Sequence, residues 1–123
     1  MAVSTQARAG VLYTSLITVT TVNKTAQFAA TSGGTLNQIE IDNTGNTAAT
    51  YVKVYDLASS VTYGTQDPSH IYFAPASQKI TYTSPEGFTF GAGIGLCAAT
   101  VGGTGAGADS APTSAVTVHV HYS

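Results

Sequence analysis

Residues 35–57, TLNQIEIDNTGNTAATYVKVYDL, decide the fold class of this chain of 123 residues. In the first half of the stretch, Ile39 and Ile41 alternate with polar residues, which is the period of a β-strand with one buried face and one wet face. The two halves are separated by residues that tolerate positive φ and favour a turn, namely Asn43, Gly45 and Asn46. The stretch therefore predicts two strands joined by a turn-rich loop.

The second half of the stretch places large side chains on both faces of its predicted strand. Val52 and Val54 share one side, whereas Tyr51 and Tyr55 share the other, with Lys53 between them. Because successive side chains of a strand point to opposite faces, neither face is plainly exposed to water. We expect this strand to be covered on both sides.

Short runs of β-branched and aromatic residues recur along the rest of the chain, and no segment has a convincing helical period. The predicted strands are residues 11–22, 71–74, 79–83, 88–90, 94–100 and 115–122, with a short run at residues 26–30 as a further candidate. Together with the central pair they predict an all-β fold, an antiparallel β-sandwich of about eight strands in one domain of residues 11–123. Strand order is invisible in one sequence, so jelly-roll and immunoglobulin-like connections both stay open. Residues 1–10 show no periodicity and are expected to form an extended or flexible N-terminal arm.

Two local patterns lead to more detailed expectations. Residues 71–74 and 79–83 are expected to form a hairpin across Pro75. Residues 84–87, Ser-Pro-Glu-Gly, have proline second and glycine fourth, which predicts a type I turn between two strands.

The composition excludes several functional classes. Four basic residues against six acidic ones leave no basic surface for a phosphate backbone, so we expect no nucleic-acid partner. No run approaches the roughly twenty apolar residues of a membrane span, and we expect no membrane partner. The single cysteine, Cys97, lies in an apolar run and is expected to be a reduced, buried thiol. Charged residues make up only 8% of the chain, about a third of the ordinary share, which indicates that other protein covers part of the surface.

Residue types that carry chemistry are present without the spacing that catalysis or metal binding needs. His119 and His121 share one face of the last predicted strand and would need His70 or a carboxylate to hold a metal, so we favour two half-exposed polar-face histidines. The glycine-rich residues 102–107 lack the lysine of a phosphate-binding loop, and no serine lies in a Gly-x-Ser-x-Gly elbow. Asp42 adjoins a turn, where bonding to the backbone explains it. We expect no catalytic, cofactor-binding or metal residues and no enzyme activity.

The tyrosines have two interpretations. Tyr51 and Tyr55, with Tyr63 and Tyr72, are of a type that stacks on sugars, but amphipathic aromatic residues are equally favoured at protein interfaces. Because the chain carries so little charge, we favour the interface, and we expect Tyr51, Lys53 and Tyr55 to form contacts between subunits.

Three segments resemble a recurrent pattern in small structural proteins of tailed bacteriophages, including phages of cyanobacterial hosts. They are IDNTGNTAATYVKVYDLASSVTYGT at residues 41–65, PASQKITYTSPEGFTFGAGIGLCAAT at residues 75–100, and SAVTVHVHYS at residues 114–123. Proteins of that group are head decoration (cement) proteins or parts of fibres and other appendages. The resemblance implies a β-sandwich module that assembles, often as a trimer, and that has no catalytic residues.

The resemblance and the composition together lead to one functional expectation. The chain is expected to be a non-enzymatic capsid decoration protein, made in the host cytoplasm and located on the virion surface. Its expected partners are the major capsid protein and further copies of itself in a homo-oligomer, a trimer by resemblance. Residues 1–10 are a candidate capsid anchor, although we favour a frayed terminus for this arm. A tail-fibre or baseplate module and a carbohydrate-binding module are the alternatives.

Overall fold

The structure, a computed structural model, describes residues 3–7, 15–103 and 110–123. Every regular element in these residues is a β-strand. The strands are β1 (Val3–Ala7), β2 (Ser15–Val22), β3 (Gln27–Ala30), β4 (Gly34–Asp42), β5 (Thr50–Tyr55), β6 (His70–Ala74), β7 (Lys79–Phe90), β8 (Ile94–Ala99) and β9 (Val116–Tyr122). The described residues accordingly contain no helix that could cross a membrane.

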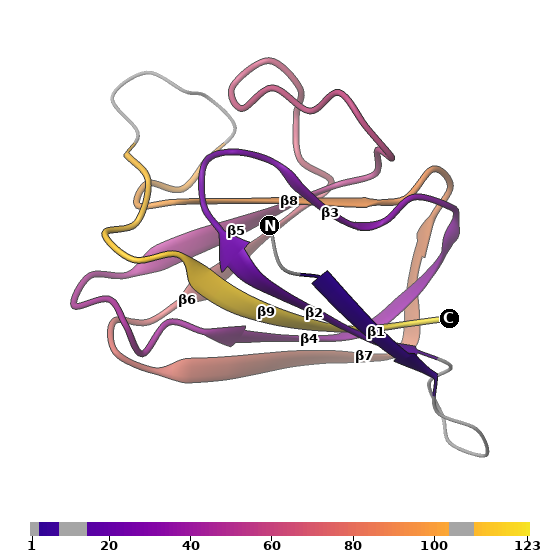
Figure 1. The fold of residues 1–123 in the computed structure, drawn as a ribbon, viewed down its shortest axis with the longest axis horizontal. Helices are drawn as coiled ribbons and strands as arrows, with labels where there is room; N and C mark the ends of the chain where they lie inside the picture. The colour runs from indigo at the N-terminus through magenta and orange to yellow at the C-terminus, as the bar shows by residue number, and fades with distance from the viewer. Residues whose placement is uncertain (1–2, 8–14, 104–109) are drawn as a thin grey trace.

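The strands form two antiparallel sheets that are layered on each other (Figure 1). One sheet has five strands in the order β1-β2-β9-β4-β7, and the other has four in the order β3-β8-β5-β6. The predicted antiparallel β-sandwich is thereby confirmed, with nine strands in the described residues where about eight were expected. Five residues of the expected N-terminal arm are described, and they form β1, which pairs along β2. Residues 1–2 and 8–10 of that arm lie outside the described residues.

The core fills the space between the two sheets, and strand alternation supplies it. Ile39 and Ile41 of β4 are buried there, as their alternation predicted. The four-stranded sheet contributes Val52 and Val54 of β5 from the other side. Apolar side chains of β9 complete the layer on the five-stranded sheet, namely Val116, Val118, Val120 and Tyr122.

The turn between β4 and β5 is held by buried amide side chains. Asn43 Nδ2 donates to the carbonyls of Ala48 at 3.1 Å and Pro75 at 3.0 Å. Asn46 Nδ2 donates to Asn43 Oδ1 at 2.8 Å and to the carbonyl of Ser114 at 2.9 Å. Because buried polar groups need partners, this network ties three connections of the chain together at one end of the sandwich.

The predicted hairpin between residues 71–74 and 79–83 is wrong. β6 belongs to the four-stranded sheet and pairs with β5, whereas β7 belongs to the five-stranded sheet and pairs with β4. The chain therefore crosses from one sheet to the other between the two strands. Alternating apolar residues fit both arrangements, because a strand has an apolar face whether its neighbour lies beside it or across the core.

The predicted turn at residues 84–87 does not separate two strands. β7 runs continuously through this segment, and β4 remains its neighbour on both sides of it. Gln38 pairs with Thr83 and Leu36 with Phe88, so Asn37 alone stands opposite residues 84–87. The extra residues form a large bulge, in which Gly87 adopts a φ of 77°. A side chain there would meet Thr35, so only glycine fits this position.

Candidate functional site

The outer face of β5 carries the three residues that were expected at a subunit interface. β5 is an inner strand, with β8 and β6 as its neighbours, and Tyr51, Lys53 and Tyr55 lie on the face that points away from the core valines. Lys53 and Tyr55 are both 0% exposed, and Tyr51 is half-buried. The strand is thus covered on both sides, as the sequence predicted.

The cover on this outer face comes from the chain itself. Val61 and Tyr63 of the connection between β5 and β6 lie over the sheet, with Val61 close to Gly95 of β8. Lys53 Nζ donates to the Tyr63 hydroxyl and lies 4.7 Å from the centre of its ring. Lys24 Nζ lies 5.0 Å from the same ring centre. In Figure 1 this connection extends on the side of the four-stranded sheet that faces away from the five-stranded sheet.

The expected interface residues must therefore be corrected. Lys53 and Tyr55 are buried within one copy of the chain and offer no surface to a partner. Of the three, only Tyr51 reaches the surface, where its ring lies 5.4 Å from that of Phe73. The physical reason is that the alternation pattern shows that a face needs cover but does not show which molecule supplies it.

Cys97 lies under the same cover, beside Lys53 in the register of β8 and β5. It is a free, fully buried cysteine, as its apolar surroundings predicted. Burial raises the pKa of its thiol to about 11, which keeps it protonated at neutral pH. Burial likewise raises the pKa of the Tyr55 hydroxyl to about 12, and that hydroxyl has no hydrogen-bond partner among the described residues. These groups are structural rather than reactive.

The outer face of the five-stranded sheet carries the histidine pair. His119 Nδ1 lies 3.0 Å from Thr18 Oγ1, and its Nε2 lies 3.8 Å from Glu40 Oε1. His70 is distant from this pair in the fold, on β6 of the other sheet, with its ring 4.5 Å from that of Phe88. No group of three or more His, Cys, Asp or Glu in the described residues is placed to hold a metal ion.

Two carboxylates close turns. Asp42 Oδ1 accepts the hydroxyl O–H of Thr44 at 2.5 Å and the backbone N–H of Thr44 at 3.0 Å, which is the bonding expected from its place beside a turn. Asp56 accepts the backbone N–H groups of Gly91 at 3.0 Å and Ala92 at 2.8 Å, just before β8. These hydrogen bonds lower the pKa of both carboxyl groups because they stabilise the charged form. Both residues have a structural explanation.

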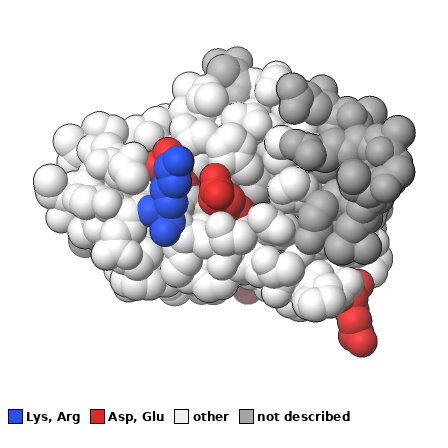
Figure 2. All heavy atoms as spheres, turned by 90° about the horizontal axis from the view of Figure 1, so that it is seen from below, with Lys and Arg blue, Asp and Glu red and all other residues white. Residues whose placement is uncertain are grey.

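Three of the five exposed large apolar side chains in the described residues lie on the flank formed by the edge strands β6 and β7. Ile71 is 39% exposed, and Phe73 and Phe88 are each 42% exposed. The two strands lie side by side across the layers: the rings of Tyr72 and Tyr82 are 5.1 Å apart, and the Tyr82 hydroxyl donates to the carbonyl of Phe73 at 2.6 Å. Figure 2, seen from the side on which β7 lies in Figure 1, shows few charged groups among mostly uncharged atoms.

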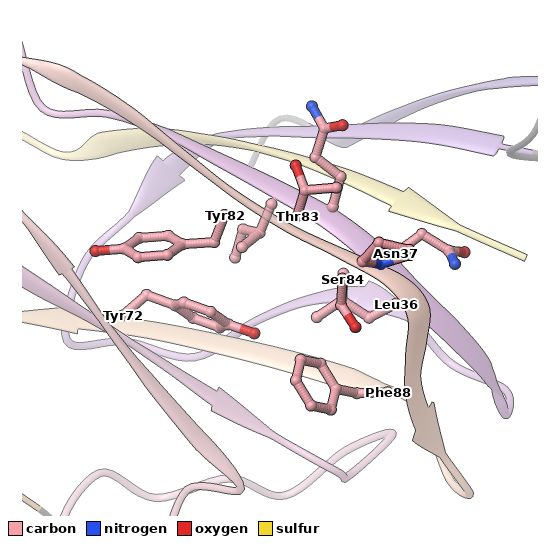
Figure 3. Close-up of a pocket in the computed structure, with 10 residues that line it drawn as sticks. Leu36, Asn37, Tyr72, Tyr82, Thr83, Ser84 and Phe88 are labelled. Atoms are coloured by element: carbon pink, nitrogen blue, oxygen red, sulfur yellow. The ribbon is translucent and has the colours of Figure 1, made fainter.

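A pocket of about 340 Å³ opens on the same flank. Leu36 and Ile39 of β4, Tyr72 of β6, and Tyr82 and Phe88 of β7 line it (Figure 3). Ser84 of the bulge forms part of its rim. Tyr72 was expected from the sequence to be suited to stacking, but the pocket was not predicted, because it depends on β6 and β7 lying in different sheets.

The comparisons with known proteins identify no relative for this arrangement. No family model matches the chain, and neither the search of curated proteins nor the search of solved structures gave a significant match.

Proposed function

We propose that this chain is a non-enzymatic structural protein that works by assembling with other protein, and that its assembly surface includes the outer side of β6. The observation that carries the proposal is the exposure of Ile71 and Phe73 on an edge strand without charge, in a chain with 8% charged residues. Natural edge strands usually carry charges, prolines or bulges that prevent pairing with another chain. β7 has such features in Lys79, Pro85 and its bulge, whereas β6 has none.

The position of this surface follows from where the chain's own cover ends. Phe73 is paired with Tyr51 and Ile71 with Lys53, so these side chains share the outer face of the four-stranded sheet. Over Lys53 that face is closed by Tyr63, but at β6 it reaches the surface. The interface residues that we propose are accordingly Ile71, Phe73 and Tyr51.

The specific form of the proposal is a capsid decoration protein on the outer shell of a tailed phage. This form rests on the sequence resemblance, which also supports a homotrimer with the major capsid protein as partner. Such a protein would act by burying surface: a standard interface buries about 800 Å² per partner, and several weak contacts made by one oligomer combine through effective concentration. A tail-fibre or baseplate module would assemble by the same burial of surface, but with a different protein of the virion as its neighbour.

The oligomer is tested by light scattering of the purified chain at micromolar concentrations. We expect an oligomer for the unmodified protein and a monomer for the double variant Ile71→Ser, Phe73→Ser. Thr81→Ser is the matched control, because Thr81 is exposed on the outer face of the other sheet. It should leave the mass of the oligomer unchanged. A monomer at every concentration of the unmodified chain would contradict assembly with itself.

The location on the virion is tested by cryo-electron microscopy of the particle that contains this chain. Symmetric density for the β-sandwich on the outer shell is the expected result. Density confined to the tail would reject decoration and favour the fibre or baseplate module.

A further inference from the structure

The pocket on the flank of β6 and β7 owes its shape to the bulge in β7. Residues 84–87 stand opposite Asn37 alone and leave the normal path of the strand. The Gly87 N–H donates to Ser84 Oγ at 3.1 Å, which closes the bulge on itself. Bulges of this kind are concentrated at functional sites, where they redirect side chains.

The interior of the pocket is apolar and aromatic. Leu36 and Ile39 form its floor and are 2% and 1% exposed. Tyr72, Tyr82 and Phe88 stand around it, as Figure 3 shows. Among the described residues, none that lines the pocket carries a charged side chain. A charged ligand would lose its hydration here without gaining a counter-ion, so the lining selects neutral molecules.

A few hydroxyl and amide groups supply polarity at the pocket. In Figure 3 the Tyr72 hydroxyl points toward Phe88 and Ser84, across the hollow. Burial raises the pKa of this hydroxyl, so it stays protonated and able to donate at neutral pH. The Ser84 hydroxyl accepts from Gly87 and keeps its own O–H for another acceptor. The amides of Asn37 and Gln38 and the hydroxyl of Thr83 complete the polar groups among the lining residues.

The balance of these groups decides the class of ligand. A volume of about 340 Å³ lies at the lower end of the range for small-molecule sites, which suits one ring with few substituents. A sugar ring carries four or five hydroxyl groups, and those turned toward Leu36 and Ile39 would be buried without partners. A mainly apolar ring with one hydrogen-bonding group leaves no such group unpaired.

We propose that the pocket between β6 and β7 is a binding site for a small neutral molecule with one apolar ring and one or two hydrogen-bonding groups, the chemistry of a simple phenol. In this site the ring packs among Tyr72, Tyr82 and Phe88 above the aliphatic floor. The ligand's hydroxyl bonds to Tyr72 or Ser84. This function is separate from assembly, because Ile71 and Phe73 do not line the pocket.

The proposal is tested on the full chain by following its amide NMR signals during titration with p-cresol. We expect saturable shifts at residues of β4, β6 and β7 around the pocket, with a dissociation constant of about 1 mM for so small a ligand. Benzoate, which is charged, and methyl β-glucoside, which is rich in hydroxyl groups, should each bind at least tenfold more weakly.

A matched pair of variants assigns the site. Phe88 and Phe73 are equally exposed and lie on the two edge strands, but only Phe88 lines the pocket. Phe88→Ala should weaken p-cresol binding about fivefold or more, and Phe73→Ala should change it by less than about twofold. Tyr72→Phe keeps the ring and removes the hydroxyl, so it should weaken p-cresol by about threefold to tenfold and leave toluene unaffected.

Three results would overturn the proposal. They are no saturable shift with p-cresol at millimolar concentration, equal weakening by Phe73→Ala and Phe88→Ala, and binding of benzoate or the glucoside as tight as that of p-cresol. The amide spectrum of each variant shows whether it is folded. If Phe88→Ala is unfolded, Phe88→Leu retains the apolar volume and should give a smaller loss of affinity at the same site.

Discussion

The outer faces of the two sheets differ although both are built from alternating strands. On the five-stranded sheet polar outward residues reach water, with His119, Glu40 and Thr81 in register across β9, β4 and β7. On the four-stranded sheet, Lys53 and Tyr55 are completely buried, and Tyr63 of the connection between β5 and β6 covers Lys53. The difference shows that large side chains on the outer face of a strand can be satisfied by a loop of the same chain, with no partner needed.

The largest expected effect on stability comes from replacing one outward residue on each sheet. Tyr55→Ala should lower the free energy of unfolding by about 3–5 kcal/mol, because it leaves a cavity on the buried outer side of the four-stranded sheet. Thr81→Ala, on the exposed face, should change it by less than about 0.5 kcal/mol. Urea unfolding of both variants provides the measurement. Equal losses would mean that the two faces are equally buried.

Tyr55→Phe separates the buried ring from its hydroxyl. Because the hydroxyl has no hydrogen-bond partner among the described residues, its removal should leave stability unchanged or raise it. A loss above about 1 kcal/mol would instead indicate a partner for this hydroxyl.

A smaller effect is expected when the connection between β5 and β6 is loosened. The alkylation rate of Cys97, which lies beneath it, reports this loosening. In the intact protein this thiol is buried and its pKa is raised to about 11, so alkylation by iodoacetamide at pH 8 should be very slow. Tyr63→Ala removes the ring that contacts Lys53, and we expect it to loosen the cover and raise the labelling rate about tenfold or more. Phe88→Ala, on the other side of β6, is the control and should leave the rate near that of the intact protein. Unchanged labelling of the Tyr63 variant would show that the loop is held by other contacts.

The smallest effect is a pH dependence from His70, which is half-buried against Phe88 and Phe90 of the other sheet. Burial lowers its pKa below the ordinary value of about 6.5. The unfolded chain therefore binds the proton more readily, and this contribution to stability, complete above about pH 6.5, is lost as the pH falls to the lowered pKa. Thermal unfolding between pH 7 and 5 should show a shallower decline for His70→Phe than for the unmodified chain. A steeper decline in the variant would show that His70 is not the cause of the loss of stability as the pH falls.

Sequence reasoning predicted most strands and the faces that are buried. Ile39 and Ile41 of β4 and Val52 and Val54 of β5 lie in the core as their alternation indicated. The turn at Asn43 was also predicted, although its buried amide network was not. These features are local, since they depend on the two-residue period of a strand and on residues that tolerate turn geometry.

The predictions from the sequence were wrong where segments distant in the chain meet in the fold. β6 and β7 were expected to pair with each other, and residues 84–87 were expected to end a strand rather than to widen it. The pocket was missed for the same reason, because its wall joins Tyr72 of one sheet to Tyr82 of the other. Strand alternation carries no information about which sheet a strand joins.

The amino-acid sequence by itself determined that this protein is an all-β sandwich and which side chains leave water. Apolar periodicity makes each strand bury a particular face, whatever it packs against. Only the tertiary structure decided that Tyr63 covers Lys53, that β6 is left with apolar residues at the surface, and that a hollow opens beside Phe88. The physical reason is that burial is a property of the whole packed chain, because a side chain is covered by whichever segment the fold brings to it.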